Sequence, residues 1–320
     1  MTDTHGKILV IRGGAIGDFV LTLPALRALR DMFPHTRIEI LGYPHIVQIA
    51  EIGGLVDAAH SIDARPLAGF FARNGDLDPA QSAFFEDFNI IVSYLYDPDG
   101  FFQANVARCS LAQFHSGPHR PREDDGVHAA ETFLKPLERL AIFGADPTPR
   151  IEVSPWRDEE SEQLISPGSR WLAAHPGSGS EAKNWPEENW VSLLKQIVEE
   201  TDLNLLVVGG EAEGDRLERL AEELPETRRF VLRNRPLAQT AQWLKLCRGF
   251  VGHDSGITHL ASAVGLPGVV FWGETNAAVW RPDAELMRLL PGGAGLRGIS
   301  VEQAFEAISA MFAGQSSADA

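Results

Sequence analysis

The sequence predicts an α/β protein made of two doubly wound, parallel-sheet domains. Short apolar segments rich in Val, Ile and Leu alternate with segments of helical periodicity along most of the chain. These apolar segments carry hydrophobic residues at successive positions, which is typical of parallel strands covered by helices on both faces. The chain has 320 residues, of which 44% are hydrophobic, and this is enough for two domains of ordinary size.

Each domain follows from its own series of elements. In the first half we expect strands at 7–11, 37–41 and 87–95, and a helix at 18–33 that ends before Pro34. In the second half we expect strands at 170–175, 203–210, 228–232, 249–254 and 267–273, and helices at 186–200, 211–223, 237–247, 256–265 and 300–312.

The division between the domains is expected where Pro, Ser and charged residues concentrate, between residues 145 and 170. The expected domains are 1–153 and 154–313, and the small polar residues 314–320 are expected to form a flexible tail. The last helix either belongs to the second domain or packs back on the first. Ligands of such sheets bind beyond the carboxyl ends of the strands, so two domains would face a common cleft.

Charge and cysteine content exclude several classes of function. The net charge of −16 argues against broad electrostatic binding to nucleic acid or to an anionic membrane. Cys109 and Cys247 are far apart and lack metal-ligand spacing, so we expect a reducing, cytoplasmic environment. No segment approaches the roughly 18 consecutive apolar residues of a membrane span, so membrane contact is expected to be peripheral at most.

The loop after the first strand places Asp18 at the start of a helix. Glycines at 13, 14 and 17 allow a sharp turn, but Arg12 occupies the first glycine position of the dinucleotide fingerprint. The second strand also lacks the acidic residue of that fingerprint, which argues against an NAD-dependent oxidoreductase. Asp18 either stabilises the helix start through the dipole or acts on a substrate, and the residues alone leave both interpretations open.

The segment HPGSGSEAKNWPEENW follows the first strand of the second half. Ser178 and the glycines around it offer backbone N–H groups and a hydroxyl, and Lys183 offers a point charge for a phosphate. The spacing is not that of a Walker A motif. An ordinary glycine-rich turn and an anion site are both compatible with this segment.

The segment GHDSGITHL places Asp254 and Ser255 at the beginning of a helix. The free N–H groups and the dipole of a helix start favour an anion, and Gly256 lets a ligand approach the backbone. Asp254 would repel a phosphate, so it either caps the helix or accepts from a sugar hydroxyl. His259, one turn into the helix, has the position of an ordinary core residue.

The segment VVGGEAEGDR ends another strand with Gly209 and Gly210. Glu211 follows them at the start of a helical segment, with Glu213 two residues later. A carboxylate at such a strand end commonly accepts from the hydroxyls of a ribose, and the alternative is a helix-start charge. Together with the preceding loops, this arrangement predicts a nucleotide diphosphate ligand in the second domain.

The chain resembles glycosyltransferase family 9, the ADP-heptose:lipopolysaccharide heptosyltransferase group. The most specific segments are GDFVLTLPAL, HPGSGSEAKNWPEENW and VGHDSGITHLASAVGLPGVVFWG. The resemblance implies a GT-B fold of two Rossmann-like domains, with the acceptor on the first domain and the nucleotide sugar on the second. It also implies inverting transfer without a metal or another cofactor.

The resemblance assigns roles to particular residues. Asp18 matches the catalytic base, Lys183 matches a lysine near the donor diphosphate, and Glu211, less surely Glu213, matches an acid at the nucleotide ribose. The remaining donor positions are Ser178, Gly209, Gly210, Asp254, Ser255, Gly256 and His259. After FWG the family usually has Pro-Thr-Asp, whereas this chain has Glu274-Thr275-Asn276.

The sequence therefore predicts an inverting glycosyltransferase that moves a sugar from a nucleotide diphosphate, ADP-heptose first, to a glycan or lipid-linked sugar. Arg120 and Arg122 are candidates for binding acidic groups of the acceptor. The Asp-x-Asp pairs at 76–78 and 97–99 have turn composition, and a metal site there is disfavoured. The alternatives are a same-fold nucleotide-sugar epimerase or hydrolase, and a nucleotide-binding protein without catalysis.

Overall fold

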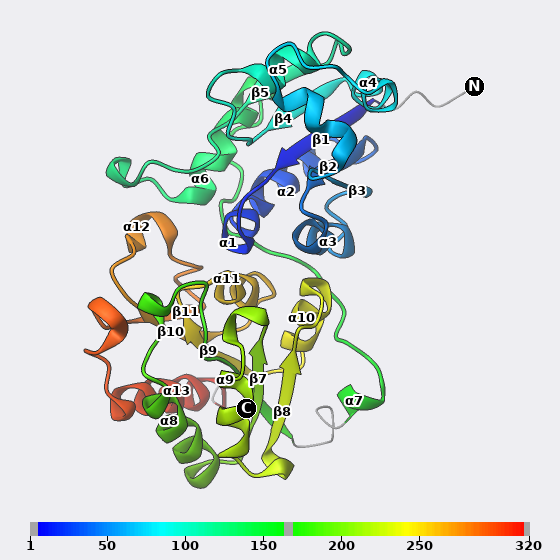
Figure 1. The fold of residues 1–320 in the computed structure, drawn as a ribbon. Helices are drawn as coiled ribbons and strands as arrows, with labels where there is room; N and C mark the ends of the chain where they lie inside the picture. Colours follow the sequence, from blue (N-terminus) through cyan, green and yellow to red (C-terminus); the bar gives the residue numbers. More distant parts are fainter. Residues whose placement is uncertain (1–5, 163–168, 317–320) are drawn as a thin grey trace. The chain divides into compact units, whose positions relative to one another are not determined.

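The computed structural model describes residues 6–162 and 169–316, and the chain divides into two compact units, Met1–Glu152 and Val153–Ala320 (Figure 1). Each unit holds one sheet in which every strand pairs with its neighbours in parallel. The prediction of two parallel α/β domains is confirmed.

The first unit contains a five-stranded sheet in the order β3-β2-β1-β4-β5. Its strands are β1 (Lys7–Arg12), β2 (Arg37–Gly42), β3 (Ala58–Ser61), β4 (Ile90–Ser93) and β5 (Gln113–Ser116). Its α-helices are α1 (Ile16–Val20), α2 (Leu23–Met32), α3 (Pro44–Ile52), α4 (Pro79–Glu86), α5 (Phe101–Val106) and α6 (Ala129–Leu134). One face of this sheet, which includes Leu9 and Ile11, packs against Phe70, Phe85 and Phe102.

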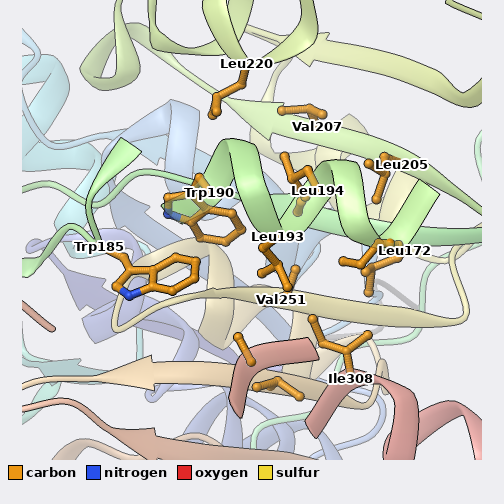
Figure 2. Close-up of a cluster of buried hydrophobic side chains, with 14 of the residues drawn as sticks. Leu172, Trp185, Trp190, Leu193, Leu194, Leu205, Val207, Leu220, Val251 and Ile308 are labelled. Carbon is orange, nitrogen blue, oxygen red and sulfur yellow. The ribbon is translucent and has the colours of Figure 1, made fainter. Parts of the chain in front are cut away.

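The second unit contains a six-stranded sheet in the order β11-β10-β9-β6-β7-β8. Its strands are β6 (Arg170–His175), β7 (Leu203–Gly209), β8 (Arg229–Arg233), β9 (Gly249–His253), β10 (Gly268–Trp272) and β11 (Met287–Pro291). Its α-helices are α7 (Glu159–Glu162), α8 (Glu187–Glu200), α9 (Arg216–Glu222), α10 (Leu237–Leu244), α11 (Gly256–Ala263), α12 (Ala277–Trp280) and α13 (Val301–Ser316). Figure 2 shows strand residues such as Leu172 and Val251 packed with Trp190 of α8 and Ile308 of α13.

Two predicted helices are divided in the structure. The helix expected at 18–33 is α1 followed by α2, and Pro24 lies in the first turn of α2, where its missing N–H costs no hydrogen bond. The helix expected at 211–223 is a 3₁₀ turn at Glu211–Glu213 followed by α9. Gly214, with φ of 53°, interrupts this segment in the left-handed region.

Strands β3, β5 and β11 were not predicted. The sequences of β3 and β5, AAHS and QFHS, lie at sheet edges and contain no buried residue, so they lack an apolar segment. The last helix, α13, packs on α8 and β10 and belongs to the second unit. It also continues through Ser316, past the expected start of the tail at 314, and residues 317–320 lie outside the described residues.

The strand orders fix where each unit can bind a ligand. In the first unit β1 lies between β2 and β4, and in the second unit β6 lies between β7 and β9. The chain crosses over in opposite directions from β1 and from β6, and the loops at the carboxyl ends diverge there to leave a crevice. Asp18, in the helix after β1, and Lys183, in the loop after β6, lie at these two switch points.

Candidate functional site

Lys183 and Asp254 meet at the switch point of the second unit. Lys183 Nζ lies 2.6 Å from Asp254 Oδ2, and the hydroxyl of Thr275 donates to the same oxygen at 2.6 Å. The side chain of Asp254 is 10% exposed, whereas that of Lys183 is 45% exposed. Since an ammonium group has three N–H donors, Lys183 can bond to Asp254 and to an anion together.

Helix α11 begins beside this ion pair. Ser255 is the N-cap, and its Oγ accepts from Thr258 N at 3.4 Å and lies 3.4 Å from His175 Nδ1. Gly256, the first residue of α11, carries no side chain that would cover the helix start. The first N–H groups of a helix have no partner within the helix, so this position favours an anion.

His253 joins the two loops of this site and was not identified from the sequence. Its Nε2 accepts from Trp185 N at 2.9 Å and from Trp190 Nε1 at 3.3 Å, and its Nδ1 lies 3.1 Å from Gly177 O. Because Nε2 accepts, Nδ1 carries the proton and donates to Gly177. Burial lowers the pKa of His253 to about 4, so the ring stays neutral.

Ser178 points into its own loop. Its side chain is buried, and its Oγ lies 2.8 Å from Ser180 O and 2.9 Å from Asn184 Oδ1. The hydroxyl therefore fixes the course of the loop toward Lys183. By contrast, a Cβ added at Gly179 would have no other atom within 4 Å, so the backbone there is open.

The two acidic residues after β7 lie in different environments. Glu213 is buried; its Oε2 accepts from Gly210 N at 2.6 Å, and its Oε1 lies 3.7 Å from His175 Nε2. Glu211, in contrast, is exposed at the carboxyl end of the sheet, directly after Gly209 and Gly210. Glu211 is thus the one of the two that can reach a ligand without rearrangement.

The remaining predicted positions of this unit support the loops. His259 is buried within α11. Trp272, at the end of β10, is also buried, and its Nε1 donates to Thr275 O at 2.7 Å, so it holds the loop that follows this strand. Asn276 caps α12 by accepting from Ala278 N at 3.1 Å, a role that an Asp performs equally well.

Asp18 lies at the switch point of the first unit. Its Oδ2 accepts from Ala15 N at 3.1 Å, which caps α1, and its side chain is 25% exposed. The second oxygen, Oδ1, lies 3.8 Å from the guanidinium of Arg12, beyond hydrogen-bond distance. The backbone at the start of α1 therefore holds Oδ2 of Asp18. Oδ1 faces Arg12 without a hydrogen bond to its guanidinium.

Arg12 is a buried cation that the sequence did not identify as part of a site. Its Nη1 donates to His119 O at 2.7 Å, its Nη2 donates to Asp18 O at 3.1 Å, and its guanidinium lies 4.4 Å from the ring centroid of Phe133. Burial lowers the pKa of Arg12, an effect that Asp18 opposes. An arginine at the end of an otherwise apolar strand is the signal that could have identified it.

Exposed charges of the first unit pair with one another or cap helices. Arg120 lies 3.6 Å from Glu123 and Arg122 lies 3.9 Å from Asp125, all on one surface loop. In the Asp-x-Asp segments, one aspartate of each caps a helix: residue 78 caps α4, and residue 97 accepts from two N–H groups of α5. Within 6–162 and 169–316, no group of three or more His, Cys, Asp or Glu is placed to hold a metal ion.

Two Rossmann-like units, each with polar residues at the carboxyl edge of a parallel sheet, make up the GT-B fold. A model of glycosyltransferase family 9 (heptosyltransferase) matches residues 125–290, more than half of the chain. The chain belongs to this family and is a glycosyltransferase. Across the described residues, no helix combines the length and the apolar character needed to cross a membrane.

Known proteins with similar sequences or folds agree with this family. Lipopolysaccharide heptosyltransferase 2 of Escherichia coli is 28% identical over 330 residues, covering 89% of each chain. The structure of a family 9 glycosyltransferase from Veillonella parvula superposes with a TM-score of 0.77 at 17% identity, covering 97% of this chain and 98% of that one. The structure of E. coli ADP-heptose lps heptosyltransferase II gives 0.75 at 16% identity, covering 97% and 99%.

Proposed function

We propose that this protein transfers a heptose from ADP-heptose to a hydroxyl of a glycan acceptor in lipopolysaccharide core assembly, with inversion and without a metal ion. The similar E. coli proteins are named for lipopolysaccharide heptosyl transfer, and one of them for ADP-heptose. The observation that carries the proposal is the Lys183–Asp254 pair beside the start of α11. It combines a half-exposed ammonium group with the N–H groups at the start of a helix, and both of these favour a diphosphate.

The donor is assigned to the second unit. The N–H groups at the start of α11 and the ammonium of Lys183 bind the diphosphate, and Asp254 orients that ammonium. Glu211, exposed at the end of β7, accepts from the ribose hydroxyls. As the sugar departs, the negative charge on the β-phosphate grows, and these preorganised donors stabilise it more strongly than they stabilise the bound donor.

The acceptor and the catalytic base are assigned to the first unit. Asp18 Oδ1 takes the proton of the acceptor hydroxyl while Oδ2 remains bonded to Ala15 N. The oxygen of that hydroxyl forms a bond to the anomeric carbon, and the bond from this carbon to the β-phosphate oxygen breaks. The electron pair leaves with ADP, and the attack from the opposite face inverts the anomeric configuration.

The first test is nucleotide binding. Isothermal titration calorimetry should show that ADP binds more tightly than UDP or GDP, and EDTA should leave the transfer rate from ADP-heptose unchanged. Asp18→Asn should reduce transfer by about 10²–10⁴-fold, the usual contribution of a general base, and leave ADP affinity unchanged. Asp31→Asn, a change of an exposed residue on α2 in the same unit, is the matched control.

Each alternative has a distinct result in the same assays. Consumption of ADP-heptose without any acceptor would identify a hydrolase or an epimerase. Binding of ADP with no turnover across core oligosaccharide acceptors would identify a nucleotide-binding protein without catalysis. Full transfer by the Asp18→Asn variant would remove Asp18 from the mechanism.

A further inference from the structure

The first unit contains a pocket of about 230 Å³ at the carboxyl ends of β4 and β5. Its walls include Tyr96, Asp97, Gln103, Phe114, Ser116 and His119. Sites for drug-sized ligands run about 300–1,000 Å³, so this pocket suits a smaller group, such as one sugar residue of a longer chain.

An exposed aromatic ring stands at this pocket. The side chain of Tyr96 is 68% exposed, the highest exposure of any tyrosine in the described residues. Its ring centroid lies 4.6 Å from that of His119, edge to face, so the two rings contact each other at the pocket. A ring so exposed offers an apolar surface on which the C–H face of a sugar can stack.

Polar groups surround the aromatic ring. Ser116 Oγ donates to Gln103 Oε1 at 3.1 Å, and both residues line the pocket. The carboxylate of Asp97 accepts from Phe102 N and Gln103 N at 3.1 and 3.0 Å. An amide, a hydroxyl and a carboxylate around an aromatic ring match the alternating hydroxyl and C–H groups of a carbohydrate.

The pocket is linked to Asp18 through one side chain. Arg12 bonds to the carbonyl oxygens of both His119 and Asp18, at 2.7 and 3.1 Å. The guanidinium is a rigid fork, so the pocket wall and the proposed base are held at a fixed separation. A sugar in the pocket is therefore close to the group that would deprotonate the acceptor.

We propose that this pocket binds a neutral sugar residue of the acceptor glycan, next to the residue that is glycosylated; this assignment rests on the proposed function. None of the described residues that line the pocket is Lys or Arg. Phosphate recognition relies on those two cations, above all on the fork of Arg. The pocket thus selects hydroxyl groups and the apolar face of a sugar, and it does not require phosphate on the acceptor.

The test uses the full-length protein and two probes: core oligosaccharide released from lipopolysaccharide by mild acid, and the same oligosaccharide after chemical dephosphorylation. Calorimetry should give the wild type the same affinity for both. Tyr96→Ala should weaken binding of both by about tenfold, which is the loss of one stacked ring, and Tyr96→Phe should retain it. Gln103→Ala should weaken binding as well.

The matched control is Phe143→Ala, because Phe143 is 70% exposed on the same unit and lies outside this pocket. This variant should bind both oligosaccharides as the wild type does. The proposal is overturned if the wild type binds neither probe, if binding requires phosphate, or if Tyr96→Ala binds as tightly as Tyr96→Phe.

Transfer from ADP-heptose and binding of ADP are measured in parallel to separate the two proposals. Tyr96-dependent binding of oligosaccharide without transfer would contradict the proposed function and leave this pocket assigned. Normal transfer by Tyr96→Ala, with an unchanged KM for the acceptor, would contradict the assignment of the pocket to the acceptor and would leave the proposed function unaffected.

Discussion

The ammonium of Lys183 lies 2.6 Å from the carboxylate of Asp254, a residue 71 positions further along the chain. Lys183 comes from the loop after β6, and Asp254 follows β9, the strand that pairs with β6. The pair thus connects the two loops of the switch point. Because Lys183 is almost half exposed, the pair contributes little to stability, and its significance is for ligand binding.

Lys183→Ala should weaken ADP binding by about 10–100-fold, because a charge-assisted hydrogen bond contributes about 1.5–3 kcal/mol. The variant also leaves the charge of Asp254 uncompensated beside the diphosphate, so Asp254→Asn in the Lys183→Ala background should restore part of the affinity. Lys195→Ala on α8, where the lysine is 41% exposed and paired with Glu223, is the control and should bind ADP normally. Equal calorimetric affinities of the wild type, of Lys183→Ala and of the double variant would contradict a diphosphate contact.

Two buried histidines make the stability of the second unit depend on pH. Burial lowers the pKa of His175 to about 3 and that of His253 to about 4, from 6.5. Between pH 6.5 and about 4 the unfolded chain therefore binds more protons than the folded unit. The stabilisation is fully present above pH 6.5. As the pH is lowered below 6.5, the free energy of unfolding decreases by up to about 1.4 kcal/mol per pH unit for each histidine.

Urea unfolding at pH 7.0, 6.0 and 5.0 measures this dependence. All 7 tryptophans belong to the second unit, so their fluorescence reports its unfolding alone. His175→Gln/His253→Gln should be less stable at pH 7.0 but should have a shallower slope. A wild-type free energy of unfolding that is the same at pH 7.0 and 5.0 would refute the prediction.

Arg12→Lys should reduce transfer without changing ADP affinity. A lysine keeps the charge but cannot span the carbonyl oxygens of His119 and Asp18. The Asp18 carbonyl still accepts from the Thr22 hydroxyl, so the main loss is the bond to His119 O, and a hydrogen bond from a charged donor contributes about 1.5–3 kcal/mol. Faster hydrogen–deuterium exchange in the peptide 7–22 would report the loosened loop. Arg65→Lys, at an exposed position in the same unit, should leave exchange and transfer unchanged.

The alternation of apolar strands and helices was enough to predict the fold class, because both sheets are parallel and their central strands are buried on two faces. The edge strands β3 and β5 could not be predicted in this way, since their residues are half-buried or exposed and their pairing depends on the neighbouring strand. Gly214 likewise resembles many other loop glycines until its positive φ is known.

For the candidate site as well, some features could be predicted from the sequence and others could not. Lys183 and Asp254 were predicted separately, because glycine-rich strand ends favour anions, but their pairing requires the strand order. Glu211 and Glu213 are indistinguishable by sequence position, and only burial separates the exposed carboxylate from the one bonded to Gly210. The role of His253 depends on hydrogen bonds to residues 63 to 76 positions away, which no local pattern contains.

Two glycines of one loop should respond differently to the same substitution. A Cβ on Gly177 would lie 2.1 Å from Glu213 Oε1 and 2.4 Å from its Cγ, whereas one on Gly179 would meet nothing within 4 Å. Glu213 is buried and bonded to Gly210 N, so it cannot simply swing away. Gly177→Ala should therefore cost about 1–3 kcal/mol and weaken ADP binding, and Gly179→Ala should cost little.

A double-mutant cycle locates the cause of this effect. If the clash with Glu213 is responsible, Gly177→Ala should be less costly in a Glu213→Ala background than in the wild type, because the space is then free. The tryptophan-fluorescence unfolding assay measures all four proteins of the cycle. Strict additivity would mean that Gly177 is required for another reason, such as the bond from His253 Nδ1 to its carbonyl oxygen. In that case His253→Gln, and not Glu213→Ala, should couple to Gly177→Ala, since the altered loop would already have lost that bond.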